Sequence, residues 1–168
     1  MGVSAGINYK METIYLFDWG NTLMVDDPKQ QGKMYLWPNV EAIEGAHEAL
    51  KALSEHHTIY VATSAQDSKE SEIQAAFQRV GLDPYINGYF CQSNLGVGKS
   101  GKKFYQTIAQ SLDVPCQQLV MVGDSLDKDI FASIDAGCRA IWYNPSKLEN
   151  DDDLVQINHL NELQKITA

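Results

Sequence analysis

The chain has 168 residues, 44% of them hydrophobic and 21% charged, which is typical of a folded globular protein and excludes a largely disordered one. Its net charge of −9 argues against a nucleic acid or an anionic membrane as the main partner, but allows a small anionic ligand. No apolar run reaches the ~18 residues of a membrane span, and residues 1–10 lack a signal-peptide pattern, so we expect a cytoplasmic protein. Cys91, Cys116 and Cys138 lie in apolar stretches and are expected to be reduced core residues.

The chain alternates between short apolar strands and amphipathic helices. Segments rich in β-branched and aromatic residues predict five strands, at 12–17, 58–62, 88–91, 119–122 and 140–143. Apolar residues spaced three and four apart predict four helices. The first begins at Pro38 and Asn39, the second covers 69–80, the third includes Phe104 to Leu112, and the fourth includes Ile130 to Ile134. The tail, 154–166, is expected to add a short strand and a last helix.

This alternation predicts a three-layer, doubly wound α/β fold, in which helices cover both faces of a parallel sheet. We expect one domain over residues 1–168, with 1–11 as a candidate disordered segment. Residues 23–37 are expected to form a hairpin flap with arms at 23–26 and 33–37. Ligands of such folds bind beyond the carboxyl ends of the strands, so functional residues are expected there.

Polar side chains follow the predicted strands at the points where function is expected. Asp18 follows the first strand, Thr63 the second and Asp124 the fourth, while the lysine-rich segment 99–103 precedes the third helix. If the first and fourth strands are neighbours, Asp18 and Asp124 converge, and carboxylates that close repel unless a cation lies between them. Oxygen ligands suit Mg²⁺, which readily shares a phosphate, and a lysine and a hydroxyl would hold the remaining phosphate oxygens. The sequence therefore predicts a metal-assisted phosphate site.

These residues and their surroundings resemble the haloacid dehalogenase (HAD) superfamily, whose members are mostly Mg²⁺-dependent phosphatases that work through an aspartyl-phosphate. Four of its motifs occur in order, as Phe17-Asp18-Trp19-Gly20-Asn21-Thr22-Leu23, Val61-Ala62-Thr63, Gly98-Lys99-Ser100 and Val122-Gly123-Asp124-Ser125-Leu126-Asp127-Lys128-Asp129. The similarity covers roughly residues 12–144. Each motif alone is weak, but the four in order, each after the expected element, indicate a HAD-like fold without a cap domain.

The resemblance implies a metal site and a nucleophile. Asp18 would be both the nucleophile and a ligand of Mg²⁺. The backbone carbonyl of Gly20 and the carboxylate of Asp124 would be further ligands, and Asp129 would orient metal-bound waters or the phosphate lysine. Covalent catalysis of this kind divides one difficult displacement into two easier ones.

The resemblance also implies that Thr63 and Lys99 bind and neutralise the transferring phosphoryl group of a phosphorylated small molecule or a phosphoprotein. Lys102 remains an alternative to Lys99 as the lysine that binds the phosphoryl group, and the other of the two is expected to be a solvated surface charge. Asp127 is also expected to be a surface charge. Thr63 and Asp124 could instead cap the helices that follow them.

Gly20 departs from the family pattern. Phosphatases of the family carry a second aspartate there, which protonates the leaving alcohol and later activates water, and such groups contribute ~10²–10⁴-fold to the rate. We therefore expect an intact metal site with turnover restricted to good leaving groups. The alternative is a catalytically impaired protein that binds a phosphorylated ligand or a protein partner.

The motif spacing leaves no room for a cap domain, because 45 positions separate Asp18 from Thr63 and 36 separate Thr63 from Lys99. Capless relatives cover the site by forming oligomers or act on large substrates, so a homo-oligomer is one expected state. Six large apolar residues are expected near the mouth of the site, where they would leave an apolar surface: Trp19, Met24, Met34, Tyr35, Leu36 and Trp37.

Overall fold

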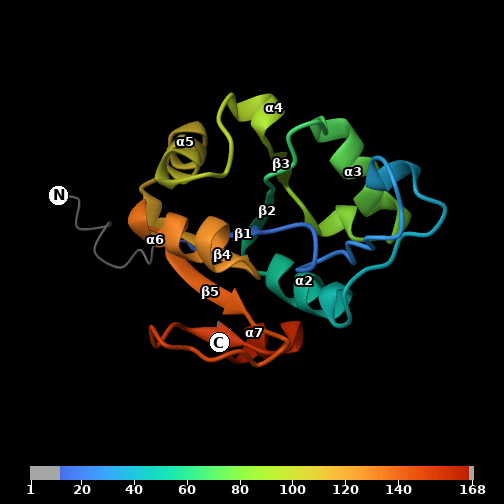
Figure 1. Cartoon of the computed structure of the whole chain (residues 1–168). Coiled ribbons are helices and arrows are strands. Elements are labelled where there is room, and N and C mark those ends of the chain that lie inside the picture. The colour runs from blue at the N-terminus through green and yellow to red at the C-terminus, as the bar shows by residue number, and fades with distance from the viewer. Residues whose placement is uncertain (1–11, 167–168) are drawn as a thin grey trace.

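The computed structural model describes residues 12–166, and the expected disorder of 1–11 lies outside them. Its centre is a six-stranded parallel sheet of order β3-β2-β1-β4-β5-β6 (Figure 1). The strands are β1 (Ile14–Phe17), β2 (Thr58–Ala62), β3 (Gly88–Phe90), β4 (Leu119–Gly123), β5 (Arg139–Tyr143) and β6 (Gln156–Ile157). The predicted α/β fold is confirmed, and the strand expected in the tail makes the sixth strand of the sheet.

The two central strands, β1 and β4, are buried along their whole length, which is why their sequences are continuously apolar. Their register pairs Phe17 with Val122, so the two strands end side by side. The N–H of Asp18 continues the pairing by donating to the Val122 carbonyl at 2.9 Å. The residues that follow these strands therefore leave the sheet at the same edge.

Helices cover both faces of the sheet, with α5 and α6 on one side of the strands and α2 and α3 on the other (Figure 1). Alternate residues of β1 serve the two faces: Tyr15 and Phe17 pack with α2 and α3, while Ile14 and Leu16 pack with α5 and α6. The α-helices are α2 (Ala46–Ser54), α3 (Glu70–Arg79), α4 (Gln92–Leu95), α5 (Lys102–Leu112), α6 (Ala132–Asp135) and α7 (Leu163–Ile166). Shorter turns are the 3₁₀ helices η1 (Met34–Leu36), η2 (Asp83–Tyr85), η3 (Cys116–Gln118) and η5 (Leu160–Glu162), and the π-helix η4 (Leu126–Phe131).

The first predicted helix begins later than expected. It starts at Ala46 instead of Pro38 or Asn39, because the preceding residues pair with the loop after β1. Ala42 bridges Met24, the Ile43 N–H donates to the Leu23 carbonyl, and Gly45 turns the chain at a φ of +84°. Backbone groups used in this pairing are not free for helical hydrogen bonds.

The helix predicted around Ile130 to Ile134 is also different. It opens as the π-helix η4, in which the Ser125 carbonyl accepts from the N–H groups of both Asp129 and Ile130. Ile134 is 43% exposed and is not a core residue. Of the cysteines, Cys91 and Cys138 are buried and Cys116 is only partly buried, and all three carry free thiols.

The hairpin predicted for residues 23–37 is wrong, because its arms do not pair with each other. The second arm forms η1 and is fixed to α3, where the Arg79 guanidinium donates to the carbonyls of Tyr35, Trp37 and Pro38. The six large apolar residues expected near the mouth of the site do not form a broad exposed patch, since Trp19, Met24, Met34 and Trp37 are buried and only Leu36 is well exposed. Within 12–166, no helix is both long and apolar enough to cross a membrane.

Candidate active site

Three aspartates converge where β1 and β4 end. Asp18 follows β1, Asp124 follows β4, and Asp129 lies in η4. One carboxylate oxygen from each lies within 4.8 Å of the others, a spacing at which one small cation can contact all three. The sequence placed these residues together, and the parallel register of β1 and β4 explains why they meet.

Lys99 is the buried cation of this cluster. Its ammonium lies 2.9 Å from Asp18 Oδ1 and 2.5 Å from Asp129 Oδ1, and it donates to the Ala62 carbonyl at 2.8 Å. These three partners use all three of its N–H bonds. Burial alone would lower the pKa of Lys99, but the charges of Asp18 and Asp129 outweigh it and raise that pKa, so the ammonium stays charged.

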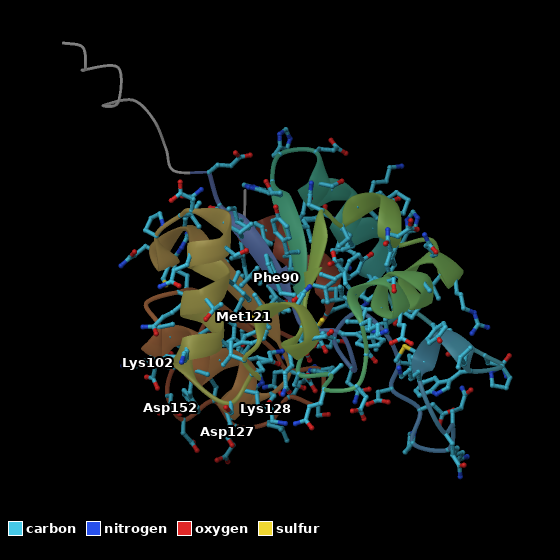
Figure 2. The ribbon with its side chains drawn as sticks, turned by 90° about the horizontal axis from the view of Figure 1, so that it is seen from above. Phe90, Lys102, Met121, Asp127, Lys128 and Asp152 are labelled. Carbon is cyan, nitrogen blue, oxygen red and sulfur yellow. The ribbon has the colours of Figure 1, made fainter. Side chains whose placement is uncertain are left out.

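The structure brings Lys99, and not Lys102, to Asp18. Lys102 is exposed at the first position of α5, and Asp127 is exposed on η4. Figure 2 shows both side chains at the periphery of the molecule. They therefore lie away from the carboxylate cluster, as expected for surface charges.

Thr22 is a member of the cluster to which sequence reasoning assigned no role. Its side chain is fully buried, and its hydroxyl lies 3.4 Å from Asp18 Oδ2 and 3.3 Å from Asp124 Oδ1. A tight turn places it there, in which the N–H groups of Leu23 and Met24 both donate to the Trp19 carbonyl. A single hydroxyl proton serves one carboxylate at a time, so it relieves the repulsion between them only in part.

Burial and mutual repulsion disfavour the charged forms of the carboxylates in this cluster. Burial raises the pKa of Asp124 to about 7, assisted by the neighbouring carboxylates of Asp18 and Asp129. Burial likewise raises the pKa of Asp129 to about 6, although the Lys99 charge acts in the opposite direction. A divalent cation among these oxygens would favour their charged forms, so the donor set fits a hard metal ion such as Mg²⁺.

Neither Thr63 nor Asp124 acts as a helix cap. Thr63 is buried, its N–H donates to the Phe90 carbonyl, and its Oγ1 accepts from the Ala65 N–H at 3.0 Å, seven residues before α3 begins. The side chain that caps η4 is Ser125, which accepts from the Lys128 N–H. Asp124 is instead tied to β5, because the Trp142 indole donates to its backbone carbonyl. Both predicted site residues therefore keep their side chains at the sheet edge.

A cleft of about 550 Å³ opens beside Asp18 and includes Gly20 and Thr63 in its wall. Its apolar wall is made by Trp19, Met34 and Trp37. The cleft thus joins the carboxylate cluster to a surface suited to the uncharged part of a substrate.

Comparisons with known proteins identify relatives of this chain. A model of the haloacid dehalogenase-like hydrolase family matches residues 20–137. Pyrimidine 5′-nucleotidase PynA of Streptococcus pneumoniae is 32% identical over 152 residues, which cover 82% of this chain and 63% of PynA. The chain spans 56–63% of the length of the curated relatives that it matches.

Solved structures share the fold. An uncharacterised protein from Listeria monocytogenes superposes with a TM-score of 0.80 over 92% of this chain and 96% of its own, at 19% identity. The HAD-hydrolase YfnB of Bacillus subtilis, in a magnesium-bound crystal structure, gives a TM-score of 0.74 over 94% of this chain and 99% of its own, at 17% identity. With the family model covering most of the chain and PynA matching four-fifths of it, the chain belongs to the haloacid dehalogenase-like hydrolases.

Proposed function

We propose that the protein is a Mg²⁺-dependent phosphohydrolase whose nucleophile is Asp18. The observation that carries the proposal is the meeting of Asp18, Asp124 and Asp129 within 4.8 Å, with the Lys99 ammonium held against two of them. Phosphoryl transfer needs this combination, because the nucleophile and the phosphate are both anionic and require positive charge to approach each other.

Mg²⁺ would be held by the carboxylates of Asp18 and Asp124 and by the Gly20 carbonyl, with Asp129 orienting metal-bound waters or Lys99. Bound there, it would neutralise charge on the phosphoryl oxygens. The oxygen-only donor set supports this assignment, as does the magnesium in the structure of YfnB. The contact between the Asp129 carboxylate and the Lys99 ammonium supports the role of Asp129 in orienting Lys99.

The chain's own residues would act in two displacements. First, an Asp18 oxygen attacks phosphorus and the bond to the leaving oxygen breaks, which leaves the phosphoryl group on Asp18. Water then attacks the same phosphorus, and Asp18 and inorganic phosphate separate. Lys99 would lower the repulsion between Asp18 and the phosphate, and the Thr63 hydroxyl, whose oxygen already accepts from Ala65, has its proton free to donate to a phosphoryl oxygen.

The substrate class is a phosphorylated small molecule, and a pyrimidine nucleoside monophosphate is the first candidate. The name of PynA supports this choice, and so does a cleft whose volume and apolar wall suit a small molecule better than a folded phosphoprotein. We further propose that no cap domain is inserted between these motifs. The residues between Asp18 and Thr63 form only η1, α2, β2 and their connecting loops, and those between Thr63 and Lys99 form only α3, η2, β3, α4 and theirs.

The test is phosphate release in the presence of Mg²⁺ from cytidine and uridine monophosphate, glucose 6-phosphate, acetyl phosphate and p-nitrophenyl phosphate. Turnover that disappears with EDTA and in Asp18→Asn supports the proposal. If the wild type and the variant are equally inactive on every substrate but still bind a nucleoside monophosphate, the alternative of a binding protein without turnover is correct instead.

A further inference from the structure

The cleft beside Asp18 has three other charged side chains in its wall: Asp26, Lys33 and Asp67. Lys33 is already paired, because its ammonium lies 2.9 Å from both carboxylate oxygens of Glu72. Asp67 belongs to the loop after β2 and lies close enough to Lys33 to interact with its charge. Asp26 differs from Lys33 and Asp67 because its side chain lies against Gly20. Gly20 is two residues after Asp18 in the sequence.

The carboxylate of Asp26 fills the space in front of the Gly20 α-carbon. A methyl group added at Gly20 would lie 3.4 Å from both Oδ2 and Cβ of Asp26, and these are its nearest neighbours. The backbone of Gly20 lies outside the left-handed region, so glycine is not required there by conformation. The space beside the nucleophile where a side chain of residue 20 would extend is therefore occupied by the carboxylate of residue 26.

The turn after β1 fixes Asp26 in this place. Asn21 adopts a left-handed conformation with a φ of +62°, and its side-chain oxygen accepts from the Asp26 N–H at 3.1 Å. The preceding residue, Val25, is also anchored, because its N–H donates to the Glu41 carbonyl. The backbone on which the carboxylate stands is thus held at two successive residues.

The Asp26 carboxylate is also available for proton transfer. Within residues 12–166, no hydrogen bond or ion pair engages its oxygens, and the side chain is exposed to the cleft. Its neighbour Asp27 is different: that carboxylate accepts from the Lys29 N–H at 2.9 Å and faces a separate hollow.

We infer that Asp26 is the acid and base of the reaction, in the position that Gly20 leaves without a side chain. The inference rests on the proposed phosphohydrolase function. As Asp18 attacks phosphorus, the bond to the leaving oxygen breaks and that oxygen takes the proton of the Asp26 carboxyl. The Asp26 carboxylate then takes a proton from water while the water oxygen attacks the phosphoryl group on Asp18. Asp18 leaves as a carboxylate, inorganic phosphate is released, and Asp26 is protonated again.

The first test compares Asp26→Asn with the matched control Asp27→Asn. Asparagine keeps the shape of residue 26 but cannot transfer the proton, and thermal unfolding would verify that both variants fold. We expect phosphate release from uridine monophosphate to fall by about 10²-fold or more in Asp26→Asn and to stay near the wild-type rate in Asp27→Asn. With p-nitrophenyl phosphate, whose leaving group needs no proton, Asp26→Asn would release a first equivalent of p-nitrophenol quickly and then stall as the phosphorylated enzyme.

A second test is rescue. Asp26→Ala empties the space in front of Gly20, so adding Gly20→Asp to it places a carboxyl there, and we expect the double variant to regain part of the rate lost in Asp26→Ala. Rates in Asp26→Asn within a few-fold of the wild type on both substrates would overturn the inference while leaving the nucleophile in place. A wild type that releases no phosphate at all, and is unaffected by Asp18→Asn, would instead remove the proposed function and this inference with it.

Discussion

The Asp129 side chain lies directly over Gly123, so closely that a methyl group at residue 123 would sit 2.2 Å from Asp129 Oδ2. That same oxygen accepts from the Ser125 N–H at 3.0 Å, while Oδ1 contacts the Lys99 ammonium. The absence of a side chain at Gly123 therefore allows Asp129 to reach Lys99, and through it to hold the cation beside Asp18. The glycine of the fourth motif has a steric role that the sequence pattern does not reveal.

Substituting Gly123→Ala tests this relationship. The added methyl must displace Asp129, and misplacement of a catalytic group by about 1 Å can cost about 10²-fold in rate. We expect phosphate release to fall by at least ten-fold. Gly101→Ala is the matched control, because nothing lies within 4 Å of a methyl group there. Equal activity of the two variants would show that the position of Asp129 does not matter to the reaction.

Removing the buried cation should affect both stability and activity. Lys99→Met leaves Asp18 and Asp129 without their partner, and breaking a buried ion pair on one side costs about 3–5 kcal/mol. We expect urea unfolding of the EDTA-treated protein to show a loss of that order, together with loss of phosphate release. Lys102→Met removes an exposed charge and should leave both unchanged. A Lys99→Met variant as active as the wild type would contradict the assignment of Lys99.

The stability of the metal-free protein should decrease as pH rises from about 4 to about 7. The pKa of Asp124 is raised from its usual 3.8 to about 7 in the folded protein, so the folded state favours the protonated carboxyl. That stabilisation is complete below the pKa of the unfolded chain and is lost as pH rises through the folded pKa. Asp129, with a pKa of about 6, contributes with the same sign.

Thermal unfolding in EDTA at several pH values measures this effect. Asp124→Asn should flatten the decrease, since the amide does not titrate. Mg²⁺ should stabilise the wild type more at pH 8 than at pH 5, because the metal binds the deprotonated carboxylates. A melting temperature of the metal-free wild type that rises steadily between pH 4 and pH 7, with no difference in Asp124→Asn, would contradict the raised pKa.

Much of the site follows from the sequence because its residues stand at the ends of strands. The continuously apolar runs before Asp18 and Asp124 predicted central parallel strands, and parallel strands bring their carboxyl ends to one edge. Lys99 could be ranked above Lys102 only by its offset in a motif; its burial between two aspartates depends on the path of the loop before α5.

The parts that could not be predicted depend on contacts between distant segments. The residues before Ala46 have helical spacing, but their backbone pairs with the loop after β1, and local periodicity cannot reveal such a partner. The same applies to η1, which is held by Arg79 more than 40 residues later in the chain. Asp26 was missed because its place beside Gly20 depends on the turn closed by the Asn21 side chain.

If Asp18 carries the phosphoryl group during turnover, intact-mass measurement will detect it on the protein. The protein is mixed with Mg²⁺ and acetyl phosphate, quenched in acid within the first turnover and weighed, beside Asp18→Asn treated in the same way. We expect the wild type to gain the mass of one phosphoryl group, the gain to map to the peptide containing Asp18, and the variant to gain none. Release of phosphate by the wild type without that adduct, or the same adduct in Asp18→Asn, would contradict it.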